Sequence, residues 1–264
     1  MDSYQSRLNE NQAAYAAVHL PSQVLAPADY RLNILSGVRE RFWAWFDAVK
    51  PAIELHESFH RLDSSQAMAF NLVFPFMDTS TGRVDTRLLE CLGLPPILHY
   101  DGAFQKVLGE KEGTRCDVYL EEAGGQRIFF NLKLAETTFG SGENDPEHRR
   151  IFDRDCRAFL ADRIDAEWLI DETSCKHERI LRLVAYLGRY PDSGLVFIYP
   201  KANESLTDSD NVIKRIVSKS LAPRVAILYL EPLLARILEA TKGDAALHAH
   251  FLQFRQKYLL AQNV

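Results

Sequence analysis

The stretch that decides the fold reads Cys116-Asp117-Val118-Tyr119-Leu120, then residues 121–126, then Arg127-Ile128-Phe129-Phe130-Asn131-Leu132-Lys133-Leu134. Two short, largely apolar runs flank a turn that contains glycine, and this pattern predicts two β-strands joined as a hairpin. Asp117 begins the first strand. Because side chains alternate between the two faces of a strand, Asn131 and Lys133 are expected to point to the same face of the second.

An acid next to such a lysine favours metal-assisted hydrolysis of a phosphodiester. Mg²⁺ prefers oxygen ligands, and a bound divalent cation stabilises charge on the phosphate and lowers the pKa of an attacking water. Here Asp117 would be the first ligand and Asn131 the second. The main-chain carbonyl of Leu132 could be a further ligand, and Lys133 would position the water and offset the developing charge.

These residues resemble the signature of the PD-(D/E)XK, or restriction-endonuclease-like, superfamily, which has an acid on one strand and (D/E)-x-K on the next. Residues 64–67, 108–117, 129–140 and 196–203 look like a group of bacterial restriction endonucleases within it. The resemblance implies an α/β fold with a central mixed β-sheet flanked by helices. It also implies an Mg²⁺- or Mn²⁺-dependent DNA endonuclease of restriction or phage defence.

The chain departs from that signature at one position. Relatives normally read Phe-Phe-Glu-Leu-Lys, whereas Asn131 here offers an amide oxygen and no charge. The number of charged ligands tunes such sites, so affinity for a hard cation should fall unless another acid contributes. Glu112, in the turn before Asp117, is one candidate metal ligand. Glu136 and Glu57 are alternatives that the sequence leaves open.

Other candidate site residues come from predicted helices and loops. Ser64 or Ser65 is expected to cap a helix that ends near Phe74, where Gln66 could reach a phosphate or a metal-bound water. Basic residues on a helix predicted over 174–188 and after a strand ending at 199 could contact nucleic-acid phosphates, although an ordinary solvated face is the alternative. These basic residues are Lys176, Arg179, Arg182 and Lys201.

The remaining chain predicts one domain over residues 31–264, preceded by a loosely attached arm over residues 1–30. Apolar runs predict buried strands over residues 195–199 and 225–230, and strands alternating with helices in this half indicate an α/β fold. The other predicted helices cover residues 30–49, 86–92, 147–160, 204–221, 231–240 and 243–260.

Composition limits the possible partners. A net charge of −5 over 264 residues means that DNA binding would need a local basic patch. The four cysteines show no metal-site spacing, and no apolar run approaches a membrane span, so we expect a cytoplasmic protein without a membrane partner. A homodimer stays open. Two other functions also stay open: a catalytically inactive nuclease fold that binds nucleic acid or protein, and a regulatory partner without nucleic-acid contact.

Overall fold

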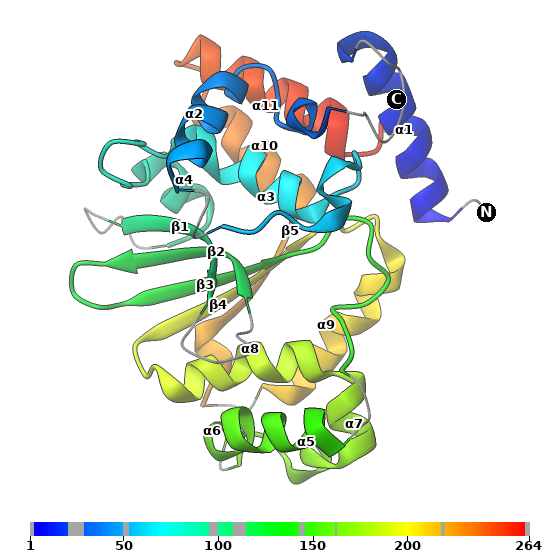
Figure 1. The fold of residues 1–264 in the computed structure, drawn as a ribbon, viewed down its shortest axis with the longest axis vertical. Helices are drawn as coiled ribbons and strands as arrows, with labels where there is room; N and C mark the ends of the chain where they lie inside the picture. The colour runs from blue at the N-terminus through cyan, green and yellow to red at the C-terminus, as the bar shows by residue number, and fades with distance from the viewer. Residues whose placement is uncertain are drawn as a thin grey trace.

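The computed structural model describes residues 3–20, 29–49, 53–94, 100–107, 115–142, 146–161, 163–217 and 220–261. At its centre lies a five-stranded sheet in the order β1-β2-β3-β4-β5 (Figure 1). The first three strands are antiparallel neighbours, and β3, β4 and β5 run parallel. The predicted α/β class with a mixed sheet is therefore confirmed. The strands are β1 (Tyr100–Val107), β2 (Arg115–Glu122), β3 (Arg127–Leu132), β4 (Ser193–Tyr199) and β5 (Val225–Tyr229).

The predicted hairpin is β2 and β3, paired from Glu121 opposite Arg127 to Val118 opposite Phe130. Gly125 takes a φ of 90° in the turn, a conformation that glycine adopts without steric cost. Both later strands also form, and β5 ends one residue before the predicted limit. Strand β1 was not predicted from the sequence. Among its described residues only Phe104 is a buried apolar side chain, so the strand lacks a strong apolar pattern.

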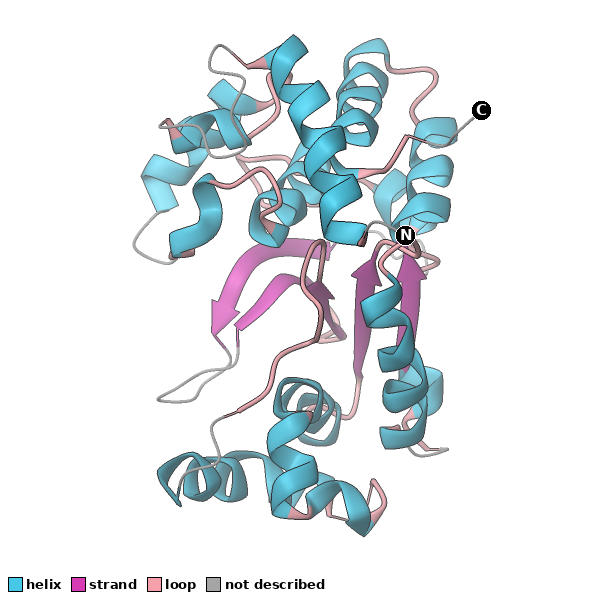
Figure 2. Ribbon diagram, turned by 90° about the vertical axis from the view of Figure 1, so that its right-hand side faces the viewer, coloured by secondary structure: helices cyan, strands magenta, loops and turns pink. Residues whose placement is uncertain are grey.

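Helices cover both faces of the sheet, and Figures 1 and 2 show the sheet between two helical layers. β3 and β4 are buried on both sides, which explains why they read as continuous apolar runs. One layer holds α1 (Tyr4–His19), α2 (Arg39–Val49), α3 (Ser65–Val73), α4 (Thr86–Cys91), α10 (Leu230–Ala240) and α11 (Ala245–Tyr258). The other holds α5 (Pro146–Phe152), α6 (Ala158–Leu160), α7 (Asp171–Lys176), α8 (Glu178–Arg189) and α9 (Glu204–Ile216).

The N-terminal helix α1 packs against the domain and is not a loose arm. It lies beside α11, and its Leu8, Tyr15 and Ala16 are buried in the same hydrophobic cluster as the central helices. Gln12 is also buried and donates to the main-chain oxygen of Leu62. The polar composition of this stretch hid the few apolar residues that α1 buries against the domain.

Two predicted helices differ in extent. The single helix expected over residues 174–188 is divided at His177, whose φ of −118° and ψ of 19° separate α7 from α8. The helix expected over residues 204–221 ends at Ile216, and Val217 is extended. The helix predicted over residues 147–160 forms as α5 and α6 joined by a π-helical turn over Asp153–Arg157.

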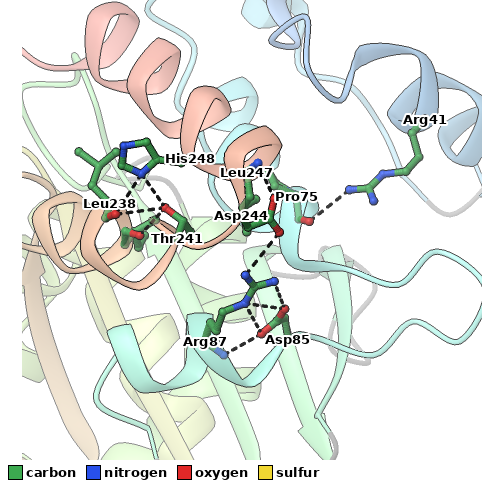
Figure 3. Close-up of polar contacts among 10 residues, drawn as sticks. Arg41, Pro75, Asp85, Arg87, Leu238, Thr241, Asp244, Leu247 and His248 are labelled. Carbon is green, nitrogen blue, oxygen red and sulfur yellow. Dashed lines mark hydrogen bonds and ion pairs between the residues drawn. The ribbon is translucent and has the colours of Figure 1, made fainter.

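A polar corner ties α4 to the turn between α10 and α11 (Figure 3). Arg87 donates to both carboxylate oxygens of Asp85 and lies 3.5 Å from Asp244, which in turn accepts from the Leu247 amide at the start of α11. Thr241 closes α10 by donating to the oxygen of Ile237. The charges are partly exposed, so they orient these helices more than they stabilise them.

Beneath this layer lies a buried polar network. Asn71 donates to the main-chain oxygen of Asn33 and accepts from the Leu35 amide. Lys257, fully buried, donates to the same Asn33 oxygen at 2.7 Å, and burial lowers its pKa well below the usual range. His250 is buried on the inner side of α11, and its Nε2 is 2.8 Å from the main-chain oxygen of Asn71.

The His250 ring predicts a pH dependence of stability. Burial lowers the pKa of His250 to about 4 from its ordinary value of 6.5. The unfolded chain therefore takes up this proton first as the pH falls from 6.5 to 4, and stability should fall by up to about 3 kcal/mol across that window. His250→Gln keeps a donor for Asn71 without a titrating ring. Urea denaturation of both proteins between pH 7 and 4 should show a clearly smaller loss for the variant, and parallel losses would contradict the assignment.

Candidate active site

The site begins where β2 and β3 part. Val118 and Phe130 are their last paired residues, and the Asp117 carboxylate occupies the gap beyond them. Its Oδ2 accepts from the main-chain N–H of Leu132 at 2.7 Å and from the Asn131 side-chain amide at 3.1 Å. The acid thus takes the place of a ladder hydrogen bond. Directly opposite positions on neighbouring strands bring side chains close together, which is how the hairpin joins Asp117 to Asn131.

Burial raises the pKa of Asp117, because the charged carboxylate is removed from water. The cations of Lys133 and Arg179 and the Leu132 N–H act in the opposite direction, while the negative charge of Glu136 adds to the rise. A perturbed carboxyl group that faces two cations and a second acid in a cleft is typical of a functional site.

Asn131 is 1% exposed, and its Oδ1 is a buried atom without a hydrogen-bond partner among the described residues. Leaving a buried acceptor unsatisfied costs about 1–3 kcal/mol, so such an atom calls for an explanation. The unsatisfied atom is an amide oxygen, and the nitrogen of the same amide contacts the Asp117 carboxylate. Amide oxygens are among the ligands that a hard cation binds.

Lys133 and Glu136 complete this part of the site. The Lys133 Nζ lies 3.9 Å from one carboxylate oxygen of Glu136. The same oxygen accepts from the Ser65 hydroxyl at 2.7 Å, and the other accepts from the Leu134 amide at 2.7 Å. Asn203 is buried and donates to the main-chain oxygens of Leu134 and Glu136, so it fixes the loop after β3 and does not cap α9.

Gln105 reaches the site from β1 through an unusual backbone. Its φ is 51°, and it is skipped in the β1–β2 register between Phe104 and Lys106. A residue other than glycine pays a steric cost for this conformation, and such strain and strand irregularities concentrate near functional sites. The irregularity places the Gln105 amide 3.4 Å from Oδ1 of Asp117.

Asp117, Lys133, Glu136, Ser65 and Gln105 line one cleft of about 830 Å³, whereas Asn131 is buried behind this lining. Gln66 is buried in its wall, where its amide oxygen accepts from the His56 amide and its nitrogen donates to the Glu54 carbonyl. It therefore braces the 53–58 segment with both ends. The predicted cap before it is confirmed, because the Ser64 hydroxyl accepts from the Ala67 amide.

Two arginines supply positive charge to the same cleft. Arg115, at the start of β2, lies 2.6 Å from the Glu54 carboxylate. Arg179 extends from α8 and donates to the main-chain oxygen of Arg115, which holds its guanidinium against the sheet. Together with Lys133 they place three cations in a cleft whose lining also includes the carboxylates of Glu54, Glu57, Asp117 and Glu136.

The basic residues predicted on one exposed helix face are separated. Arg182 is buried and pairs with Glu178 at 2.5 Å, so it is not on that face and cannot contact a phosphate without breaking this pair. Lys176 ends α7, is exposed and is not among the residues that line the cleft. Lys201 is exposed beyond the carboxyl end of β4 and is also outside the lining.

The predicted metal ligands have mixed positions. Glu136 and Glu57 both line the cleft, whereas Glu112 falls outside the described residues. Leu132 contacts Asp117 through its N–H, where the prediction used its carbonyl. Within the described ranges, no group of three or more His, Cys, Asp or Glu side chains is arranged to hold a metal ion.

Sequence reasoning missed Gln105, Arg115, Glu54 and His56. Gln105 reaches Asp117 only because its strand leaves the regular register, and Glu54 and His56 belong to a segment that Gln66 holds over the sheet. No local sequence pattern predicts that Gln105, Glu54 and His56 lie in the site. Arg115 could have been noticed, since it is a basic residue two positions before the acid on the same strand face.

The chain matches the family model described as "Restriction Endonuclease associating with ARP" over residues 7–259. A comparison with curated proteins found no match. A comparison with solved structures found none either. Among the described residues, no helix is both long and apolar enough to cross a membrane.

The buried Asp117 carboxylate should lower the free energy of unfolding at neutral pH. Its folded-state pKa is raised, so as the pH climbs above the ordinary carboxyl range the unfolded chain ionises first and the native state loses stability. Asp117→Asn keeps an oxygen that can accept from Leu132 and Asn131. Thermal denaturation should show the variant more stable than the wild type at pH 7.5, with the gap closing toward pH 3. A less stable variant at pH 7.5 would contradict the expected penalty.

Proposed function

Because the chain belongs to the restriction endonucleases associating with ARP, we propose that it is a DNA endonuclease of PD-(D/E)XK type that works with Mg²⁺ or Mn²⁺. Asp117 would be the acid of the first strand, and Asn131 and Lys133 would occupy the positions of the (D/E)-x-K pair. The observation that carries the proposal is that Asp117, Lys133 and a second carboxylate, Glu136, line one cleft.

The side-chain oxygen atoms of Asp117, Asn131 and Glu136 are of the kind that a hard cation binds. The Asn131 side chain contacts the Asp117 carboxylate through its amide nitrogen and leaves its oxygen unpartnered, and Glu136 lies close enough for its charge to act on Asp117. Asp117 and Asn131 would hold the ion, and Glu136 would supply the charge that Asn131 lacks. When bound, a divalent cation would stabilise the charge on the phosphate and acidify a water.

Glu136 is the better replacement acid among the described candidates. It is positioned by Ser65 and the Leu134 amide, and it neighbours Lys133. Glu57 also lines the cleft, but it belongs to the short 3-10 turn Glu57–His60 on the opposite wall. With Glu136, three residues after Lys133, in place of an acid at position 131, the site would still hold two negative charges.

The chain's own cations would bind and orient the substrate. Lys133 would hold the attacking water and offset charge that builds on the phosphate in the transition state. Arg115 and Arg179 would contact neighbouring phosphates, because guanidinium groups match phosphate oxygens in geometry and charge. A duplex bound through these cations agrees with a role in restriction or phage defence. Lys176 and Lys201 would be outlying phosphate contacts.

A second function is a catalytically inactive nuclease fold that binds nucleic acid or protein. Its specific support is the hydrogen bond from the Asn131 amide to Asp117, which gives this acid a neutral partner where relatives have a second carboxylate. In that case the cleft would keep its cations and its shape, and DNA binding would survive without cleavage.

Cleavage assays separate the two functions. Wild-type protein should nick or cut plasmid DNA with Mg²⁺ or Mn²⁺, and Asp117→Ala or Glu136→Gln should lower the rate about 100-fold or more, since each removes a group aimed at the reacting centre. Glu239→Gln, an equally conservative change on exposed α10, is the matched control and should cleave normally.

The assay has two contrary outcomes. If Asp117→Ala still cleaves DNA, Asp117 is not part of the catalytic site. If the wild type is inactive and Asn131→Glu gains cleavage, the site is correct, but the protein is the inactive binding module.

Binding can be tested apart from cleavage. Arg179→Gln should weaken binding of a fluorescent duplex and lower the salt dependence by about one released ion, because it removes one phosphate contact. Fluorescence anisotropy at several salt concentrations measures both. Lys242→Gln, which removes an exposed charge at the end of α10, should leave both unchanged. Equal effects of the two variants would mean that the cleft does not bind the duplex.

A further inference from the structure

Gln105 is the only described residue other than glycine that has a positive φ, 51°. Its neighbours Phe104 and Lys106 keep their partners on β2, and the position that the ladder leaves out between them sets Gln105 opposite Asp117. Side chains at opposite positions of neighbouring strands lie on the same face and contact each other. The strained backbone therefore lies directly beside the acid of the candidate site, and strain of this kind clusters at active sites and ligand sites.

The two carboxylate oxygens of Asp117 have different surroundings. Oδ2 accepts from the Leu132 N–H at 2.7 Å and from the Asn131 amide at 3.1 Å, and both donors belong to β3. Among the described residues, Oδ1 accepts a hydrogen bond only from the Gln105 amide, at 3.4 Å. This distance is beyond the usual range of about 2.7–3.2 Å for an N–H donor, so the bond is weak. Oδ2 thus fixes the acid to the sheet, whereas Oδ1 can exchange its partner.

Gln105 and Asn131 offer the same chemical group from different sides of Asp117. Asn131 is 1% exposed, lies behind the cleft lining and turns its nitrogen toward the acid. Gln105 is half-buried and lines the cleft together with Asp117 and Glu136. Amide oxygens are among the ligands that hard cations bind. The edge strand β1 can therefore supply an oxygen from within the cleft, which the buried Asn131 does not.

We propose, on the basis of the metal-dependent function above, that Gln105 is a further ligand of the divalent cation and binds it through Oε1 beside Oδ1 of Asp117. A half-turn of the amide about its last side-chain bond puts this oxygen where the nitrogen now lies, because both ends of the group are similar in size. Adjacent ligands of octahedral Mg²⁺, each about 2.0–2.1 Å from the ion, are about 3 Å apart. The Gln105 nitrogen and Oδ1 are 3.4 Å apart, so both groups can bind one cation after a small movement.

A ligand and a simple hydrogen-bond donor predict opposite effects on metal binding. A residue that only donates an N–H to Oδ1 competes with the cation for that oxygen, so its removal would leave the affinity for the cation unchanged or higher. Removal of a ligand lowers the affinity. The direction of the change therefore identifies the role of Gln105.

Titration of the full chain with Mn²⁺, followed by electron paramagnetic resonance of the free ion and without DNA, measures this change. Gln105→Asn is one methylene shorter and tolerates a positive φ, so it should melt no lower than the wild type and bind Mn²⁺ roughly tenfold more weakly. Gln105→Glu keeps an oxygen at the same reach and should bind at least as tightly as the wild type. Gln126→Asn and Gln126→Glu, in the turn at the other end of the β2–β3 hairpin, are the matched controls and should leave the affinity unchanged.

Two results would overturn the proposal. If Gln105→Asn binds Mn²⁺ as tightly as the wild type or more tightly, Gln105 is not a ligand, and the cleavage function assigned to Asp117 is unaffected. If the wild type binds no Mn²⁺, this ligand and the metal-dependent function are both wrong. A wild type that binds Mn²⁺ through Gln105 and cleaves no DNA would support the ligand and contradict only the proposed cleavage.

Discussion

The Asp117 carboxylate, held where two strands separate, is the contact on which the site depends. Regular pairing of β2 and β3 stops at Val118 and Phe130, and beyond that point the acid accepts the Leu132 N–H that a continued strand would have used. Where two strands separate, main-chain N–H and C=O groups lose their hydrogen-bond partners. A carboxylate can accept from such an N–H group, but its charge must then be buried, which is unfavourable. The raised pKa of Asp117 is the electrostatic sign of that cost.

The surrounding structure supports this opening from several elements. Glu136 connects the end of β3 to α3 through Ser65, and Gln66 of the same helix braces the 53–58 segment that forms the far wall. Gln105 approaches from the irregular part of β1. A packed sheet with helices on both faces is rigid enough to hold such a strained and charged arrangement, which a loop could not do alone.

The helical layers also explain why charge is distributed unevenly. Arg182 is buried in the helical layer that contains α8, where it forms an ion pair with Glu178. Its charge is therefore not available at the protein surface. Arg115 and Arg179 instead converge on the cleft, one from a strand and one from a helix. The same cleft is also lined by carboxylates, so its cations alternate with acids and do not form a separate basic surface.

The sequence by itself determined the hairpin, the two parallel strands after it and the α/β class, since alternation and continuous apolar runs are local signals. It also brought Asp117, Asn131 and Lys133 together, because hairpin pairing follows from a short turn. Only the tertiary structure placed Glu136 with Ser65, buried Arg182, divided the helix at His177 and drew Gln105 into the cleft. Those positions depend on which segments pack together across long stretches of chain, and residue spacing carries no information about that packing.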